Sequence, residues 1–71
     1  MIANLRTIRK QRGMTQGQLA EAARINRVTI AKYEKGQVEP TLDSAKRMAD
    51  ALGTTVDSLI GGEIDDKTAD D

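Results

Sequence analysis

Residues 25–36, INRVTIAKYEKG, carry two sets of side chains on one predicted helix. At about 100° per residue, one arc collects three cations, two small apolar side chains and no acid. Its members are Arg27, Val28, Ala31, Lys32 and Lys35. Solvated helix faces commonly mix acids and bases, whereas guanine edges and thymine methyl groups require donors beside apolar groups. The arc is therefore either an ordinary solvated surface or one that reads a DNA major groove.

The opposite arc of this segment has core character. It holds Thr29, Ile30 and Tyr33, with Glu34 at its edge. We expect this arc to be the buried side of the helix, because an amphipathic helix turns its apolar stripe inward.

Catalytic chemistry has few candidate residues in this chain. The sequence has no histidine, no cysteine and no Gly-rich phosphate loop. Nucleophilic, general-base and zinc sites usually draw on those residues, so we predict no enzyme, no cofactor, no metal and no small-molecule ligand. No apolar stretch approaches the ~18 residues of a membrane span, and no signal-peptide pattern is present, so a cytoplasmic protein without a membrane partner is expected.

Charge is unevenly distributed along the 71 residues, although the formal net charge is zero. Residues 1–62 hold ten basic and six acidic side chains, a net of +4. Residues 63–71 hold five acids and one lysine, a net of −4. A single basic domain over 1–62 and an acidic, disordered tail over 63–71 are predicted.

Helical spacing dominates the apolar pattern, and alternating strand patterns are missing, so the fold class is all-α. Five helices are predicted, ending in turn at Gly13, Ala23, Gly36, Gly53 and Gly61–Gly62. The predicted N-caps of the last four are Thr15 (in a capping box with Gln18), Asn26, Thr41 and Thr54. The inward stripe of the fourth helix is Leu42, Ala45, Met48, Ala49 and Leu52. Arg24 occupies a short turn where a positive φ, and hence glycine, is expected.

The chain resembles the Cro/C1-type repressor domains, or XRE family, over roughly residues 3–60. The matching stretches are LRTIRKQRGMTQGQLAEAA, INRVTIAKYEKG and LDSAKRMADALGTTVDSL. The resemblance implies a compact five-helix, lambda-repressor-like DNA-binding domain, with a helix-turn-helix at its second and third helices. It also implies double-stranded DNA as the partner.

Carried over by position, the resemblance implies three groups of residues. Those expected to contact bases are Arg27, Val28, Ala31 and Lys32. Those expected to contact phosphates are Gln16, Thr29, Lys35 and Gln37. Arg9 and Glu34 match a structural ion pair of the family, and Arg6, Lys10 and Arg12 are expected to be solvated cations.

The short fifth helix carries three apolar residues, Val56, Leu59 and Ile60. One interpretation is a homodimer interface, because so short a helix cannot bury all three, and the family often pairs through this end. The other is that all three complete the core of one chain. A symmetric dimer would read a pseudo-palindromic operator.

Two functions from different classes follow. The first is a sequence-specific transcriptional regulator, expected to repress by occupying an operator. The alternative is an antitoxin-like or bridging protein-interaction module that uses the acidic tail or the apolar patch of the fifth helix.

Overall fold

The computed structural model describes residues 2–61, and this part of the chain contains five α-helices. They are α1 (Leu5–Gln11), α2 (Gln16–Ala23), α3 (Arg27–Lys35), α4 (Leu42–Leu52) and α5 (Val56–Leu59). Within this range no residue is in a strand, so the all-α, five-helix prediction is confirmed. The predicted acidic tail lies outside the described residues. In residues 2–61 no helix has the length and apolar character to cross a bilayer.

Local capping explains where most of the helices begin and end. Thr15 and Gln18 form the capping box at the start of α2, with both reciprocal hydrogen bonds present. The Asn26 side chain accepts from the Val28 backbone N–H at 2.8 Å and starts α3. Helix α3 ends at Gly36, which adopts a left-handed φ of 74° that glycine tolerates at little cost.

One predicted cap is displaced by a residue. Thr55, and not Thr54, is the N-cap of α5, and its hydroxyl accepts from the Ser58 backbone N–H at 3.1 Å. Two adjacent threonines offer the same capping chemistry, so the local pattern could not choose between them.

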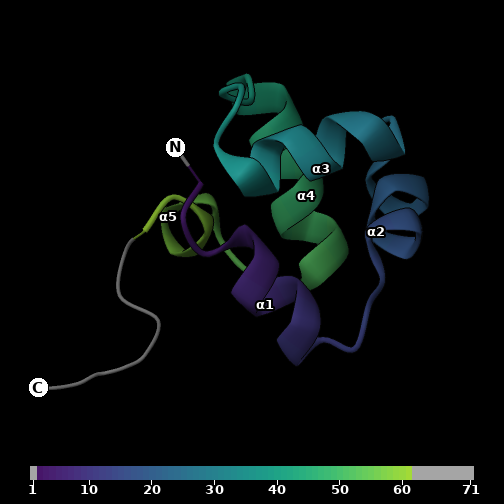
Figure 1. The fold of residues 1–71 in the computed structure, drawn as a ribbon. Helices are drawn as coiled ribbons and strands as arrows, with labels where there is room; N and C mark the ends of the chain where they lie inside the picture. The colour runs from purple at the N-terminus through teal and green to yellow at the C-terminus, as the bar shows by residue number, and fades with distance from the viewer. Residues whose placement is uncertain (1, 62–71) are drawn as a thin grey trace, which may run out of the picture.

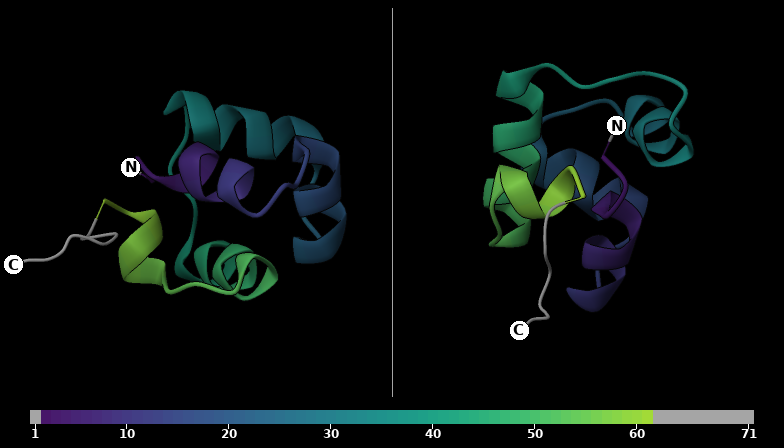
Figure 2. Two further views of the ribbon diagram at one scale, coloured as in Figure 1. Left: turned by 90° about the horizontal axis from the view of Figure 1, so that it is seen from below. Right: turned by 90° about the vertical axis from the view of Figure 1, so that its left-hand side faces the viewer.

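Helices α2 and α5 lie at opposite sides of the domain, with α1, α3 and α4 between them (Figures 1 and 2). Helix α2 packs against both α3 and α4, while α1 packs against α3. The buried cluster consists of Ile2, Leu5, Ile8, Leu19, Ala20, Ala23, Ile30, Tyr33, Met48, Ala49, Leu52 and Leu59. This one core fixes α3 relative to α2 and leaves the outer side of α3 uncovered.

Leu42 contradicts the predicted inward stripe of α4, because it is 69 % exposed. Its direction around the helix matches that of the buried Ala45 and Ala49. However, Leu42 is the first residue of the helix, and helical side chains lean toward the N-terminus. Its side chain therefore extends past the end of the core.

Helix α5 is attached to the N-terminal residues by a pair of hydrogen bonds. The Asn4 backbone N–H donates to the Leu59 carbonyl at 3.1 Å, and the Asn4 side chain donates to the Ser58 carbonyl at 2.8 Å. Leu59 is fully buried beneath this contact. The prediction that Leu59 lies in a dimer interface is therefore wrong: its side chain belongs to the core of its own chain. Val56 is half-buried against the core, and Ile60 remains 49 % exposed.

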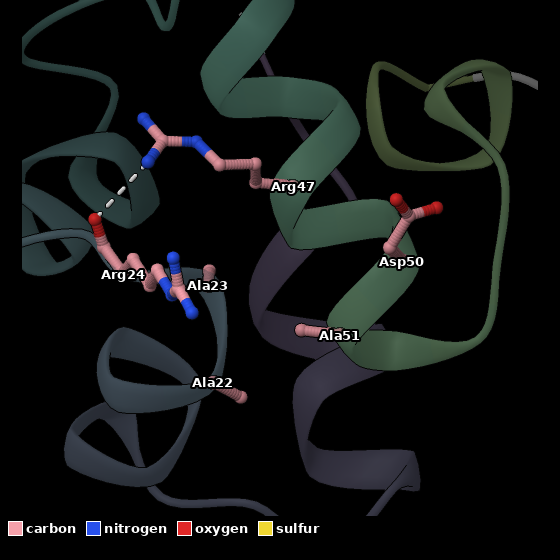
Figure 3. A pocket seen from close by; sticks show the side chains of 6 residues that line it. All are labelled: Ala22, Ala23, Arg24, Arg47, Asp50 and Ala51. Atoms are coloured by element: carbon pink, nitrogen blue, oxygen red, sulfur yellow. Dashed lines mark hydrogen bonds between the residues drawn. The ribbon is translucent and has the colours of Figure 1, made fainter.

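Arg24 is the only non-glycine residue with a positive φ in the described part of the chain, with φ 60° and ψ 45°. It ends α2 in the left-handed region, where a Cβ crowds the following carbonyl. The Arg24 carbonyl accepts a hydrogen bond from Arg47 Nη1 at 3.3 Å (Figure 3), which ties the turn to α4. That bond uses the backbone and does not require an arginine side chain.

Replacing Arg24 with glycine should raise the free energy of unfolding by about 0.5–1 kcal/mol, because glycine adopts this φ without strain. Urea unfolding followed by circular dichroism measures the change. Gly53→Ala is the matched control, since Gly53 has φ +67° and no atom within 4 Å of an added Cβ. The free energy of unfolding of Gly53→Ala should fall by about 1 kcal/mol, because of backbone strain alone. A less stable Arg24→Gly protein would contradict this account of the turn.

Candidate nucleic-acid interface

The outer side of α3 is an exposed, acid-free surface. Arg27, Lys32 and Lys35 are exposed, and Val28 is 61 % exposed between them. Ala31 is half-buried on the same side and leaves space between the longer side chains. We call these five residues the α3 face. The structure brings all four predicted base-contacting residues together on this face.

The start of α2 lies beside the start of α3. A Cβ added at Gly17 would be 4.0 Å from Cδ of Arg27 and 3.8 Å from the hydroxyl of Thr15. The stem of Arg27 therefore passes close to the first turn of α2. Both distances are ordinary van der Waals contacts, so space does not require a glycine at position 17, which costs up to about 1 kcal/mol in helix propensity relative to alanine.

A buried ion pair connects α1 to α3. Arg9 Nε donates to Glu34 Oε2 at 2.6 Å and Arg9 Nη2 donates to Glu34 Oε1 at 3.1 Å. The two side chains are 9 % and 3 % exposed. Arg9 Nη1 also donates to the Met14 carbonyl at 2.7 Å, in the loop before α2. One guanidinium thus holds three segments together.

Gln16, the first residue of α2, joins this network. Its Nε2 donates to Glu34 Oε1 at 3.0 Å. A glutamine amide has two N–H donors, so one is committed to Glu34. The bond fixes the Gln16 side chain at the N-terminus of α2, where backbone N–H groups and the helix dipole favour an anion.

The network also determines the charge state of Glu34. Burial raises the pKa of the carboxyl, but hydrogen bonds from Arg9 and Gln16, together with the positive charges of Arg9 and Arg6, outweigh it. The net result is a pKa below the usual value, so Glu34 is ionised at neutral pH. Because Glu34 is paired and almost fully buried, its negative charge does not interrupt the α3 face.

The predicted phosphate-contacting residues are not equivalent in the structure. Lys35 and Gln37 are exposed at the end of α3, whereas Thr29 is half-buried. The Gln37 backbone N–H donates to the Lys32 carbonyl at 2.9 Å and closes the end of the helix. Gln16 lies at the start of α2, and its side chain meets α3 at Glu34, the residue before Lys35.

The sequence did not predict some of the hydrogen bonds that hold the helices in position. Arg12, expected to be a solvated cation, donates from Nε to the Leu52 carbonyl at 2.7 Å. It therefore stabilises the C-terminal end of α4. The Gln16–Glu34 bond was also unforeseen, and no signal within a few residues of either position could have shown it.

A separate hollow of about 420 Å³ lies between α2 and α4. Its lining residues are Ala22, Ala23, Arg24, Arg47, Asp50 and Ala51 (Figure 3). None of the predicted DNA-contacting residues lines it. In the described residues, no group of three or more acidic, histidine or cysteine side chains is placed to hold a metal ion.

Comparison with known proteins identifies the fold and the family. A family model described as helix-turn-helix matches residues 5–59. The immunity repressor protein of Bacillus phage phi105 is 39 % identical over 59 residues, which cover 83 % of this chain and 41 % of that protein. The transcriptional activator BcrR of Enterococcus faecalis is 36 % identical over 59 residues, covering 83 % of this chain and 29 % of that protein. The chain therefore spans less than half the length of either relative.

Solved structures agree with the sequence comparison. The restriction-modification controller protein C.AhdI from Aeromonas hydrophila superposes with a TM-score of 0.76 at 28 % identity. The match covers 79 % of this chain and 85 % of the controller protein. The Cro/C1-type resemblance is thus confirmed by a family model, by relatives and by the fold. The chain belongs to the Cro/C1-type (XRE) helix-turn-helix family.

Proposed function

We propose that this protein is a sequence-specific, double-stranded DNA-binding transcriptional regulator that places α3 in the major groove. The observation that carries the proposal is the acid-free α3 face, held in a fixed orientation to the start of α2 by Glu34. A helix surface that only contacts solvent does not require buried hydrogen bonds that fix its orientation relative to a second helix. The repressor, activator and controller proteins matched above support a regulatory role.

Base readout falls to the α3 face. Arg27, at the start of the helix, would donate two hydrogen bonds to guanine O6 and N7. Val28 offers an apolar contact to a thymine methyl group, and Lys32 adds a donor one turn later. Ala31 allows close approach of the helix to the bases because its side chain is small.

Phosphate contacts are expected from the start of α2 and from residues of and just after α3. The anchored Gln16 amide and the backbone N–H groups of the first turn of α2 would receive one phosphate. Lys35 and Gln37 would contact the backbone at the C-terminal end of α3, and the half-buried Thr29 would add a smaller contact near its start. These contacts set the register of the helix on the duplex and contribute affinity that does not depend on sequence.

We infer repression as the outcome, by occupation of an operator. The phage phi105 relative is named a repressor and the E. faecalis relative an activator, so the family accommodates both outcomes. Repression by occupying an operator requires only a surface that binds DNA, and the α3 face is such a surface. The regulator would act in the cytoplasm, where prokaryotic and phage DNA is accessible, and we assign it no catalytic role.

Selection from a pool of random-sequence duplexes at low salt tests the proposal. We expect enrichment of a motif whose half-site spans the few base pairs that one recognition helix reaches. A variant with Arg27→Ala and Lys32→Ala is the control, and it should enrich no motif although its fold is unchanged. Failure of the natural sequence to enrich a motif would refute sequence-specific binding.

We also propose a homodimer through α5. Ile60 is exposed and Val56 is half-buried four residues earlier, so the two lie on one side of the helix end. A second copy that covered them would place two recognition helices about 34 Å apart on the DNA. Leu59, which is buried, would contribute only by supporting this surface from within.

Ile60→Asp should convert the dimer to a monomer, because a carboxylate would then be buried unpaired in the interface. Sedimentation velocity measures this change. The monomer should retain its free energy of unfolding to within about 0.5 kcal/mol, since residue 60 is half exposed. Leu42→Asp is the matched control: Leu42 is an equally apolar, exposed residue on a different helix. A natural sequence that stays monomeric at high concentration would contradict the dimer.

A further inference from the structure

We propose that the acidic segment 63–71 binds the α3 face of its own chain when DNA is absent, and so competes with DNA for that face. The competition with DNA rests on the proposed DNA-binding function, whereas the contact between the segment and the α3 face is independent of it. The segment would act as a tethered substitute for the phosphate backbone, lowering affinity for DNA that lacks a good site.

Charge complementarity is the first argument. Residues 63–71 carry a net charge of −4, and the rest of the chain carries +4. On the described surface, the α3 face concentrates three exposed cations without an acid. The nearest carboxylate on α3, Glu34, is neutralised by Arg9 and cannot repel an incoming acidic segment.

The place where the segment leaves the domain is the second argument. Gly61 lies beside Ala3, and the preceding turn is hydrogen-bonded to Asn4. The N-terminal residues lie between α5 and the Lys35 end of α3 (Figures 1 and 2). Arg6, which follows close by, is near enough to Glu34 to lower its pKa. Arg6 therefore adds an exposed cation on α1 close to α3.

The reach of the segment is the third argument. Nine extended residues span at most about 30 Å, whereas the nine residues of α3 extend about 14 Å. If the segment lies along the whole of α3, about 16 Å of its reach remains for the path from α5. Tethering gives it an effective concentration in the millimolar range, so a contact whose own dissociation constant is millimolar or lower would occupy the α3 face for much of the time and weaken DNA binding accordingly.

A spin label on the full chain tests the binding directly. The sequence has no cysteine, so Ala69→Cys provides a single attachment site. At low salt, the nitroxide should broaden the backbone amide signals of Arg27, Lys32 and Lys35. The broadening should diminish in about 0.5 M salt, which screens the attraction. Broadening confined to residues next to the exit point, such as Ala3 and Asn4, would overturn the proposal.

DNA affinity tests the competition. A full-length variant with Asp65→Asn and Asp66→Asn should bind a random duplex about 3- to 10-fold more tightly at low salt, because less of the α3 face is occupied. Asp50→Asn with Asp57→Asn is the matched control: it removes the same charge from exposed positions on α4 and α5. An equal gain from both pairs would show that net charge alone matters, and would refute competition at the α3 face.

The two measurements separate this proposal from the DNA-binding function. Broadening on the α3 face without DNA binding would support the intrachain contact and refute the proposed function. DNA binding without broadening would leave the function intact and refute the intrachain contact.

Discussion

Replacing Glu34 with glutamine should lower the free energy of unfolding by about 3 kcal/mol. The change leaves the Arg9 guanidinium almost fully buried without its carboxylate, and removing one partner of a buried pair typically costs about 3–5 kcal/mol. A domain of this size has only a modest total stability, so the loss is a large fraction of it. Urea unfolding at neutral pH, followed by circular dichroism, measures the effect.

Asp43→Asn is the matched control for this prediction. Asp43 also pairs with an arginine, Arg47, at 3.2 Å, but the two side chains are 80 % and 41 % exposed. An exposed pair four residues apart on a helix contributes about 0.3–0.5 kcal/mol. Similar losses in Asp43→Asn and Glu34→Gln would contradict the special role of the buried pair. Replacing Arg9 and Glu34 together with methionine should cost less than the Glu34 change alone.

The effect of Glu34→Gln should also depend on pH. The pKa of Glu34 is lowered in the folded state, so its ionised form stabilises the fold at pH values above the ordinary carboxyl pKa. That contribution is lost as the pH falls through the lowered, folded-state pKa. The stability difference between the natural sequence and Glu34→Gln should therefore shrink in strong acid. A difference that stays constant down to that range would show that the carboxylate charge is not responsible.

Replacing Arg27 with alanine should weaken binding to the selected DNA site by about 1–3 kcal/mol, roughly 5- to 150-fold, and relax preference at one base position. The physical reason is the loss of a bidentate hydrogen-bond donor to a guanine. No neighbouring side chain on the α3 face replaces this donor. Fluorescence anisotropy at fixed salt, with the selected duplex and its single-base variants, measures both effects. Arg27 is exposed, so the free energy of unfolding should hardly change.

Gln16→Ala provides the contrast for Arg27→Ala. A phosphate contact carries no base information, so this variant should weaken all duplexes by a similar factor and leave the preferred sequence unchanged. Its Nε2 bond to Glu34 is lost as well, so the unfolding free energy must be measured beside the affinity. Equal loss of specificity in both variants would contradict the division between base-contacting and phosphate-contacting residues.

Capping chemistry and periodicity determined the elements of this fold from the sequence. Thr15, Asn26 and Gly36 gave the limits of α2 and α3, because each acts on backbone groups within a few residues. The helical wheel likewise separated the buried Ile30 and Tyr33 from the exposed cations of α3. The pairing of Arg9 with Glu34 came from the family resemblance, since nothing in their spacing implies it.

Only the tertiary structure decided features that depend on how far along a helix the core extends, or on residues distant in sequence. Leu42 points in the same direction around α4 as the buried residues, yet it is exposed. A helical wheel gives only the direction of a side chain around the helix, and not whether the core extends that far along it. Leu59 is buried because α5 packs against α4 and is hydrogen-bonded to Asn4, far away in sequence. The Gln16–Glu34 bond, which anchors one end of the proposed DNA contact, likewise required two helices to meet. Local rules act over about four residues, whereas these contacts exist only once the whole chain has packed.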